Sequence, residues 1–405
     1  MRTFGEITNR FGDRELLVGK SGSTSYAEFF ELVEGRSIEA ELPSNLALSL
    51  EWTTDSYSRF FRVMLSGQSV FPGEIFPEGD LASFLPQAPL LILKTGGSTG
   101  RPRHVVHSVE RFLEKYSLKE SPPSRQMVLY APSHIAGLDA FLQAVHRGGT
   151  LVLPEDRSPR AIAESIEEQS VEVLPASPTM LQFLLLSGEL EGRDLSSVKV
   201  IPHGAEPMPE ALSRRVKEVF PAARLVQRFG MTELGALPVR EDPKDSRAMY
   251  LEAANHTWKV QDGELHIWSP GRMLGTLEEG LMDDSDPWFR TGDLAERTPR
   301  GSIRILGRRD SLINVGGEKV LPGLVEDMIL QVPAIRDALV FAIPNPMTGQ
   351  AVAARIVCEG ELELVDVLSK LRTLARENGY PLACVPTRIE FVTQLEMTES
   401  GKRLR

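Results

Sequence analysis

Short apolar runs alternate with helical patterns along the middle of the chain. The apolar runs are the expected strands, at residues 89–93, 105–106, 128–130, 151–153, 171–174, 198–201 and 224–226. Between them the expected helices lie at residues 108–116, 138–146 and 209–220, and two more begin at Ser158-Pro159 and Ser177-Pro178. This rhythm predicts an α/β fold with βαβ units and a mostly parallel sheet. Ligands of such sheets bind beyond the carboxyl ends of the strands.

The pattern differs at the two ends of the chain. Residues 25–28 have the spacing of a capping box and predict a helix, and a second helix is expected over residues 55–65. From about residue 250, period-two alternation and frequent Gly/Pro turns predict short strands. Past a charged segment we expect a compact α+β unit, with helices and strands at residues 324–330, 338–343, 351–357, 364–378 and 388–392. We therefore expect an N-terminal domain of residues 1–307 and a C-terminal domain of residues 308–405.

Composition excludes some classes of protein. The 405 residues carry a net charge of −11, which argues against a generic nucleic-acid binder. Cys358 and Cys384 are too few for a disulfide framework, so a reducing cytoplasm is the expected location. No apolar run approaches the ~20 residues of a membrane helix, and residues 1–6 lack an apolar signal core. We therefore expect a cytoplasmic protein without a nucleic-acid or membrane partner.

A glycine-rich segment, KTGGSTGRPR at residues 94–103, follows one of the buried strands. Its glycines let a ligand approach the main chain closely, and the hydroxyl groups of Thr95, Ser98 and Thr99 can bind the same ligand. Two arginines add positive charge. Together these groups predict an anion cradle for a nucleotide's phosphates. The alternative is a Gly/Ser turn between two strands. The segment is not a Walker A loop, because no Gly-Lys-Ser/Thr closes it.

Five motifs follow one another along the chain. They are TGGSTGRPR at 95–103, FGMTE at 229–233, RTGD at 290–293, GRRD at 307–310 continuing to GGE at 316–318, and TESGK at 398–402. In this order they resemble the motifs of the adenylate-forming enzymes: acyl- and aryl-CoA synthetases, adenylation domains of peptide synthetases and firefly luciferase. The resemblance covers residues 89–405 well and 20–75 weakly. Each motif alone is weak evidence, whereas all five in order are specific. Residues 105–108 add a similarity to o-succinylbenzoate-CoA ligases.

The resemblance implies a two-step reaction that uses ATP, Mg²⁺ and coenzyme A. A carboxylic acid attacks the α-phosphate of MgATP to give an acyl-adenylate and pyrophosphate, and a thiol then displaces AMP. The first step joins two anions, so it needs neutralising charge and alignment rather than a covalent protein nucleophile. The implied fold is a large N-terminal domain, with βαβ sheets and a small distorted barrel, followed by a small mobile α+β C-terminal domain.

The resemblance also assigns roles to individual residues. Nucleotide and phosphate contacts fall to Thr95, Gly96, Gly97, Ser98, Thr99, Gly100, Arg103, Gly204, Ala205, Glu206, Phe229, Gly230, Asp293 and Arg308. Thr232 would bind the α-phosphate, and Glu233 would hold Mg²⁺ through carboxylate oxygens. Phe229 would lie against adenine, and Asp293 would accept hydrogen bonds from the ribose. Without the flanking motifs, Thr232-Glu233 would be a helix cap and Asp293 a turn residue.

Further assignments concern the C-terminal part. Lys402 would reach the carboxylate and the α-phosphate in the first step, although by position alone it is a solvated tail lysine. Asp310 would be the hinge of the C-terminal domain, or otherwise a surface charge in a loop. Gly316 and Gly317 would line the passage for the thiol, and Arg308 would contact the ribose in one arrangement of the domains.

The acid-binding site is less well defined. His134 lies where the family has a His or aromatic residue that gates the acid, although a lone histidine there is otherwise a cap or core residue. Peptide-synthetase domains usually have an aspartate near this position, so His134 argues against an amino-acid substrate; Asp139 lies nearby but off that position. A carrier-protein phosphopantetheine is the alternative acceptor. A non-catalytic nucleotide-binding relative is a third alternative, against which Glu233, Asp293 and Lys402 argue.

Overall fold

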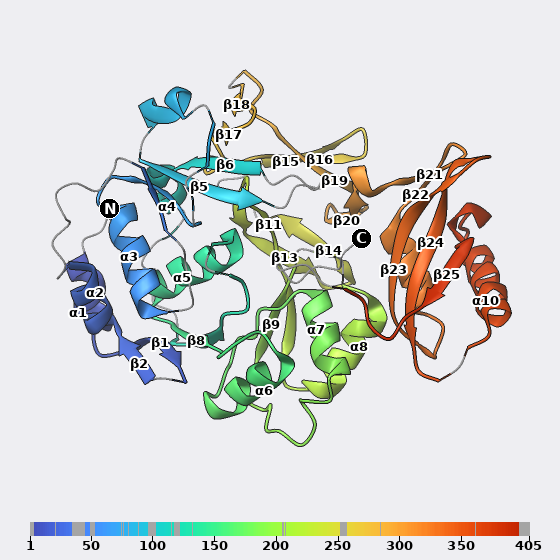
Figure 1. Cartoon of the computed structure of the whole chain (residues 1–405), viewed down its shortest axis with the longest axis horizontal. Coiled ribbons are helices and arrows are strands. Elements are labelled where there is room, and N and C mark those ends of the chain that lie inside the picture. The colour runs from blue at the N-terminus through green and yellow to red at the C-terminus, as the bar shows by residue number, and fades with distance from the viewer. Residues whose placement is uncertain are drawn as a thin grey trace.

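The computed structural model describes residues 4–20, 22–34, 45–48, 53–73, 75, 77–79, 81–87, 89–95, 103–114, 116, 122–131, 133–204, 206, 208–251, 257–283, 285–360 and 362–396. The N-terminal helices lie at one end of the molecule and the C-terminal sheet with its helices at the other (Figure 1). Three further sheets lie between these ends. The candidate site is built from the edges and turns of these three sheets.

The first sheet carries the strands expected to be parallel. Its order is β2-β1-β8-β7, and bridges at Val173 connect it to β9-β10. Neighbouring strands are parallel except β1 with β2, which confirms the predicted βαβ pattern. The strands are β1 (Glu15–Gly19), β2 (Gly22–Ser25), β7 (Arg125–Met127), β8 (Thr150–Leu153), β9 (Val200–His203) and β10 (Arg224–Gln227). Two predictions shift: β7 precedes the expected 128–130, and 171–174 contributes only the bridges of Val173.

Helices cover both faces of this sheet. One apolar core includes Phe29, Phe61 and Phe141 on one face, and another includes Ile162 and Met180 on the opposite face. The helices are α1 (Phe4–Phe11), α2 (Tyr26–Glu34), α3 (Thr54–Leu65), α5 (Ile135–Arg147), α6 (Pro159–Glu168), α7 (Pro178–Leu186) and α8 (Glu210–Val219). Burial on both faces explains why its strands read as apolar runs rather than alternating patterns.

Side-chain caps fix where several of these helices begin. The Ser25 and Glu28 side chains each accept a hydrogen bond from the other residue's backbone N–H, at 3.2 and 2.7 Å, so the capping box of α2 is confirmed. The Oγ atoms of Ser158 and Ser177 accept from the third residue beyond, at 3.2 and 3.1 Å. Proline then occupies the first turn of α6 and α7, where its missing N–H costs nothing.

The second sheet has the order β18-β17-β6-β5-β4-β3. It contains β3 (Asn45–Ala47), β4 (Ser69–Phe71), β5 (Leu90–Thr95), β6 (Arg103–Ser108), β17 (Gly275–Thr276) and β18 (Gly280–Leu281), flanked by the 3₁₀ helix η1 (Ala82–Gln87) and by α4 (Val109–Glu114). The expectation that residues 105–106 belong to the parallel alternation is wrong. Strand β6 pairs antiparallel with β5, in register from Leu90–Ser108 to Thr95–Arg103, while β5 pairs parallel with β4 on its other side. Only residues 96–102 separate β5 from β6, which is too few for the crossover that a parallel pair requires.

The third sheet is antiparallel throughout, in the order β13-β14-β20-β19-β16-β15. It contains β13 (Val239–Asp242), β14 (Asp245–Leu251), β15 (Thr257–Gln261), β16 (Glu264–Trp268), β19 (Phe289–Arg297) and β20 (Ile303–Arg308). The hairpin of β11 (Phe229–Met231) and β12 (Gly235–Leu237) packs on its apolar core. This half-barrel sheet corresponds to the small distorted barrel that the resemblance implied.

The C-terminal sheet has the order β22-β21-β24-β23, with β25 parallel to β24. Its elements are η2 (Arg309–Ser311), β21 (Ile313–Val315), β22 (Glu318–Val320), α9 (Pro322–Ile329), β23 (Ile335–Asn345), β24 (Gly349–Cys358), α10 (Leu364–Glu377), η3 (Leu382–Cys384) and β25 (Arg388–Phe391). It has its own apolar core and meets α7 through a hydrogen bond of 2.6 Å from Gln182 Nε2 to Arg336 O.

Candidate functional site

The β5–β6 hairpin presents the glycine-rich loop. Thr95 and Arg103 are register partners at the end of the two strands, so the loop between them begins and ends on paired backbone. Leu90 to Leu93 are fully buried, which makes the base of the hairpin rigid. Arg103 is exposed, and its Nη2 lies 3.3 Å from Oε1 of Glu279. Five predicted phosphate-binding residues lie outside the described residues: Gly96, Gly97, Ser98, Thr99 and Gly100.

A buried histidine connects this hairpin to the second motif. His107 of β6 is 1% exposed, and its Nε2 lies 2.7 Å from the carbonyl oxygen of Thr232. A carbonyl can only accept, so Nε2 carries the proton and donates it. On the other side, Met273 donates its backbone N–H to the carbonyl oxygen of Glu233, at 2.7 Å. The Thr232-Glu233 backbone is therefore held from both sides, and both residues remain half-buried. No motif in the sequence indicates this role for His107.

Asp293 faces Arg308 across neighbouring strands. The two residues are register partners of β19 and β20, and Arg308 Nη1 lies 3.2 Å from Oδ1 of Asp293. The same Nη1 donates to the carbonyl oxygen of Thr291, at 2.7 Å. Gly292, which lies between Thr291 and Asp293 in the sequence, has a φ of 73°. A Cβ added to it would lie 2.9 Å from Arg308 Nη2. The positive φ therefore favours glycine at this position, whereas the flexible Arg308 side chain could move away from a Cβ.

Burial and nearby charges have opposing effects on the Asp293 carboxyl. Burial raises the pKa of its carboxyl, Arg308 lowers it, and repulsion from Asp310 and Glu233 raises it again, with a raised pKa as the result. Glu233 and Asp293, which are 60 residues apart in the sequence, thus act on each other through space. Among the described residues no three His, Cys, Asp or Glu side chains are grouped to hold a metal alone. One carboxylate such as Glu233 fits Mg²⁺, which takes its other ligands from phosphates and water.

Glu264 is a buried carboxylate beneath this turn, and the sequence indicated no function for it. The residue is 3% exposed, and its Oε1 accepts from the backbone N–H of Gly292, at 3.1 Å. Its Oε2 lies 3.2 Å from both Arg290 Nη2 and Arg309 Nε. Arg309 directly precedes Asp310, whose Oδ1 lies 3.9 Å from Arg308 Nε. The predicted hinge therefore adjoins the Asp293 turn and shares charged partners with it.

The carboxyl ends of β9 and β10 supply the next group. An added Cβ at Gly204 would lie 2.6 Å from the carbonyl oxygen of Arg228, so only glycine fits there. Glu206 accepts a hydrogen bond from Thr179 Oγ1 through Oε2, at 2.6 Å. Phe229 is half-buried at the start of β11, and a Cβ at Gly230 would lie 2.8 Å from the carbonyl oxygen of Gly235. Ala205 lies outside the described residues.

His134 stands at the first turn of α5, as its N-cap residue. It is half-buried and makes no side-chain cap bond, while its backbone N–H donates to Ala131 O at 2.9 Å. Asp139 is buried one turn further along the helix. Its carboxylate accepts from Tyr116 Oη at 2.6 Å and from Gln143 Nε2 at 2.5 Å. The carboxylate of Asp139 is thus bound within the fold.

The two glycines proposed to line the thiol passage lie on a tight hairpin of the C-terminal sheet. Gly316 and Gly317 join β21 to β22 with φ values of 60° and 101°, which only glycine adopts freely. Gly317 N–H donates to Asn314 Oδ1 at 3.0 Å, and Gly316 N–H to Thr348 O at 3.0 Å. Lys402 lies outside the described residues.

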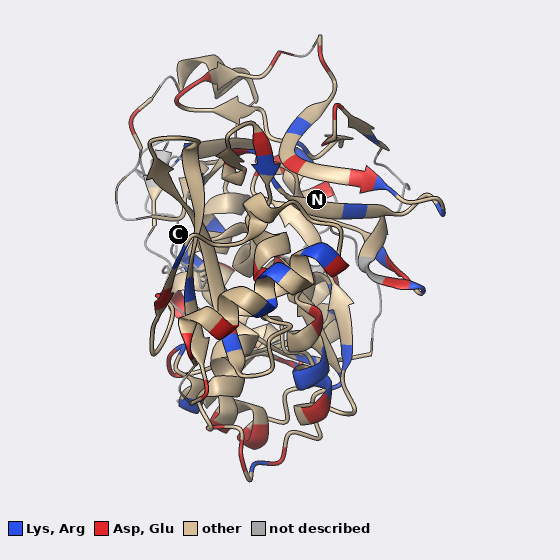
Figure 2. Ribbon diagram, turned by 90° about the vertical axis from the view of Figure 1, so that its right-hand side faces the viewer, with Lys and Arg blue, Asp and Glu red and all other residues tan. Residues whose placement is uncertain are grey.

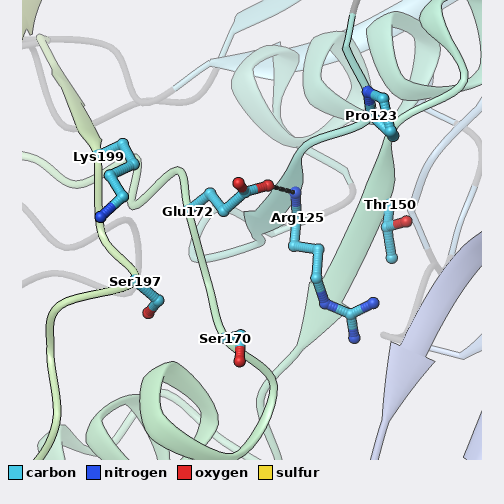
Figure 3. Close-up of a pocket in the computed structure, with 7 residues that line it drawn as sticks. All are labelled: Pro123, Arg125, Thr150, Ser170, Glu172, Ser197 and Lys199. Atoms are coloured by element: carbon cyan, nitrogen blue, oxygen red, sulfur yellow. Dashed lines mark hydrogen bonds between the residues drawn. The ribbon is translucent and has the colours of Figure 1, made fainter.

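A surface hollow lies at the opposite edge of the first sheet (Figure 3). Its volume is about 440 Å³, and it is lined by Pro123, Arg125, Thr150, Ser170, Glu172, Ser197 and Lys199. Arg125 and Thr150 are the first residues of β7 and β8, so the hollow faces the amino ends of the strands. Arg125 already donates to Glu15 Oε2 at 2.7 Å and to Gln169 O at 2.7 Å. The position and these internal contacts separate the hollow from the candidate site.

Charged residues of both signs lie on the face of the molecule that Figure 2 shows. Basic and acidic residues are interspersed over the helices and strands in view (Figure 2). Of the helices that the structure describes, none combines the length and apolar composition needed to cross a membrane.

Two family models match the chain. The model described as AMP-binding enzyme matches residues 49–275, and the model described as AMP-binding enzyme C-terminal domain matches residues 324–402. Among curated proteins, a 4-coumarate–CoA ligase-like protein of Oryza sativa is 28% identical over 78% of this chain and 60% of its own length. An L-proline–[L-prolyl-carrier protein] ligase of Pseudomonas fluorescens is 27% identical over 72% of this chain and 61% of its own length. The chain thus spans about three-fifths of the length of these relatives.

Solved structures share the fold over nearly the whole chain. The anthranilate CoA ligase AuaEII in complex with anthranoyl-AMP superposes with a TM-score of 0.81 at 17% identity, over 99% of this chain and 95% of that one. The o-succinylbenzoate CoA synthetase of Bacillus subtilis, with its acyl-adenylate, gives 0.74 at 19% identity, over 99% and 96%. At these identities the likeness establishes the fold, and the ligands belong to those proteins.

Proposed function

This chain belongs to the family of AMP-binding enzymes, and on that premise we propose that it is an AMP-forming acid–thiol ligase. A carboxylate oxygen of a small organic acid attacks the α-phosphorus of ATP, and the bond from that phosphorus to pyrophosphate breaks. The thiol of coenzyme A then attacks the acyl carbon, its proton passes to solvent, and AMP leaves. The observation that carries this proposal is the convergence of Glu233, Asp293 and Arg308, in which His107 holds the backbone next to Glu233 through the carbonyl oxygen of Thr232.

The residues of this convergence suit a nucleotide. Asp293 presents an acceptor at the end of a buried turn, and two ribose hydroxyls could donate to its carboxylate. Arg308 would keep that carboxylate charged and contact the ribose. Phe229 offers a half-buried ring for adenine, next to the closely packed backbone of Gly230, and Gly204, Ala205 and Glu206 would form the loop beside the base.

Phosphate binding falls to the loop of the β5–β6 hairpin and to Thr232. Backbone N–H groups and hydroxyls of Thr95, Gly96, Gly97, Ser98, Thr99 and Gly100, with Arg103, would surround the β- and γ-phosphates. Thr232 would donate to the α-phosphate, from a backbone that His107 fixes. When bound, Mg²⁺ would supply neutralising positive charge at the phosphates, with Glu233 as its protein ligand.

The C-terminal domain, residues 308–405, would move relative to residues 1–307. Asp310 is the proposed hinge, because it follows the last strand of the half-barrel sheet and starts the C-terminal unit. Lys402 would neutralise the attacking carboxylate and the α-phosphate in the first step. For the second step, the Gly316–Gly317 hairpin would form one wall of the thiol passage. The absence of side chains there would let the phosphopantetheine arm approach the backbone.

Loading of a carrier protein is the second candidate function. It is favoured by the 27% identity to a ligase that acts on a prolyl-carrier protein. His134 in place of an aspartate supports a carboxylic acid without an amino group. Both candidates use intracellular substrates, and the free Cys358 and Cys384 agree with a proposed cytoplasmic location.

The test is a measurement of pyrophosphate and AMP from ATP over a panel of aliphatic and aromatic acids, with and without coenzyme A. Pyrophosphate release with one class of acid, together with AMP turnover that depends on coenzyme A, is the expected result. Pyrophosphate release without any stimulation of AMP turnover by coenzyme A would favour the carrier-protein function. No release with any acid would refute both.

A further inference from the structure

The apolar helix α7 contains one buried amide side chain, that of Gln182. The residue is 4% exposed, and its sequence neighbours Leu181 and Phe183 pack on the apolar core beneath the helix. A buried amide needs hydrogen-bond partners, because an unpaired donor or acceptor away from water costs free energy. Gln182 has a partner at each of its two polar atoms. One of these partners belongs to the C-terminal sheet.

The Gln182 amide connects three elements of the fold. Its Nε2 donates to the backbone carbonyl oxygen of Arg336 at 2.6 Å, across 154 residues of sequence, and Arg336 lies at the start of β23. Its Oε1 lies 3.5 Å from Nη1 of Arg215, a half-buried residue of α8. Figure 1 shows α7 and α8 beside the C-terminal sheet. We call this set of hydrogen bonds the Gln182 contact.

The boundary is polar at the Gln182 contact. Among the described residues, the apolar core that α7 covers and the core of the C-terminal sheet are separate clusters. Arg336 pairs with Glu359 and donates from Nη1 to Pro333 O at 3.1 Å, so the carbonyl that Gln182 reaches is held by its own sheet. Burial lowers the pKa of Arg215, and two of the charges that act on it, Arg336 and Glu359, come from across the boundary. Polar boundaries of this kind are typical of domains that move relative to each other.

The Gln182 contact involves different elements from the proposed hinge. The hinge segment η2 follows β20, and its Arg309 Nε lies 3.2 Å from Glu264 Oε2 of the half-barrel sheet. A domain joined at one segment can still turn about it, until a second contact fixes its orientation. Gln182 supplies such a contact through a single hydrogen bond across the boundary. Water can replace that bond when the domain turns away, so the contact is reversible.

We propose that Gln182 is a positioning residue, which holds the C-terminal domain in the described arrangement and thereby sets the balance between the two reaction steps. The domain that turns about Asp310 serves the first step with Lys402 and the second step with the Gly316–Gly317 hairpin. A contact that favours one arrangement therefore slows the step that needs the other. One intramolecular hydrogen bond changes such an equilibrium by about two- to tenfold. The effect on the two steps rests on the proposed function.

The test measures the two half-reactions of the purified full chain separately. Pyrophosphate exchange into ATP reports the first step, and thioester formation from supplied acyl-adenylate and coenzyme A reports the second. Gln182→Met keeps the volume of the side chain and removes its hydrogen bonds. One half-reaction should become about two- to tenfold faster and the other slower, because the variant spends less time in the described arrangement. Two rates that fall together, or do not change, would overturn the inference.

Two further variants assign the effect to this contact. Gln331→Met removes a glutamine contact within the C-terminal unit, from Nε2 to Asp327 O at 3.4 Å, and should keep the wild-type ratio of the two rates. Arg215→Gln removes the partner of Gln182 Oε1 and should shift the ratio in the same direction as Gln182→Met, by a smaller factor. If Gln182→Met does not fold, an unchanged ratio in Arg215→Gln refutes the proposal. An equal shift in Gln331→Met would refute it as well.

Hydrogen exchange followed by mass spectrometry tests the Gln182 contact without turnover. Residues 333–337 should exchange faster in Gln182→Met than in the wild type, although the substitution lies on the other side of the boundary. Faster exchange confined to α7 would indicate only local loosening of the helix and would contradict the inference. If no acid supports either half-reaction, the proposed function fails, while the exchange over residues 333–337 still decides whether Gln182 holds the C-terminal domain.

Discussion

The imidazole of His107 donates from Nε2 to the carbonyl oxygen of Thr232 over 2.7 Å, joining segments 125 residues apart. One residue lies on the hairpin that presents the glycine-rich loop, and the other lies in the FGMTE motif. The two segments proposed to bind the phosphates are therefore connected by one buried hydrogen bond. Reactions that depend on alignment are sensitive to such a connection.

His107→Ala should weaken both the fold and the first step. Loss of the donor leaves a buried carbonyl unpaired and a small cavity, which should cost about 1–3 kcal/mol of unfolding free energy. The kcat of pyrophosphate release should fall, because Thr232 is no longer held. His107→Gln can donate from its amide and should recover part of the rate, which a merely space-filling role for His107 would not explain. Urea unfolding and steady-state kinetics of the two variants check this.

Asp293→Asn should weaken nucleotide binding without lowering the stability of the fold. The raised pKa of Asp293, due first to burial, means that the folded chain disfavours the ionised carboxyl. Its contribution to stability is therefore lost as pH rises from the carboxyl's ordinary pKa through the raised value. The amide variant should equal or exceed the wild type in unfolding free energy at pH 8. Its affinity for ATP should fall about tenfold or more, because a charged acceptor is lost. A large loss of stability at pH 8 would contradict this.

Glu264→Gln should loosen the turn that carries Asp293. Although burial raises the pKa of Glu264, Arg290, the Gly292 N–H and Arg309 lower it, and the net pKa is below the usual value. Stability from this carboxylate is thus present above the unfolded pKa and lost as pH falls through the folded one. The variant should lose about 1–2 kcal/mol near pH 7, a difference that shrinks in acid. Glu296→Gln, which breaks a half-exposed pair with Arg304, is the control and should change little.

Lys402→Ala should distinguish the two steps. Without the ammonium, the rate of pyrophosphate release should fall by about a hundredfold or more. Thioester formation from supplied acyl-adenylate should be unaffected, because in that step the thiol attacks the acyl carbon and no carboxylate attacks the phosphate. Arg403→Ala, the neighbouring cation in the tail, should leave both steps near wild type. Equal losses of rate in the two steps for Lys402→Ala would contradict a specific role of Lys402 in the first step.

Local signals in the sequence predicted the beginnings of helices well. The box at Ser25 and Glu28 and the serine caps of α6 and α7 form the expected hydrogen bonds, since each needs only three or four neighbouring residues. Strand partners were harder to predict, because an apolar run does not indicate which strands it pairs with. Residues 105–106 lie in β6, which pairs antiparallel with β5 instead of joining the parallel sheet. Within 171–174, only Val173 makes a bridge.

The motifs predicted the site residues as a set, and the structure adds the residues that support them. Glu264 and His107 belong to no spacing pattern, because their contacts reach across 26 and 125 residues. A buried carboxylate or imidazole looks like any strand residue in sequence. Their roles appear only when the chain folds and brings distant charges together.

The most direct measurement is the exchange of labelled pyrophosphate into ATP by the purified full chain in the presence of Mg²⁺. The exchange reports reversible acyl-adenylate formation alone. It should require a carboxylic acid and proceed without coenzyme A. A folded protein, shown by a cooperative unfolding transition, that exchanges no label with any acid would contradict the activation of an acid at the α-phosphorus.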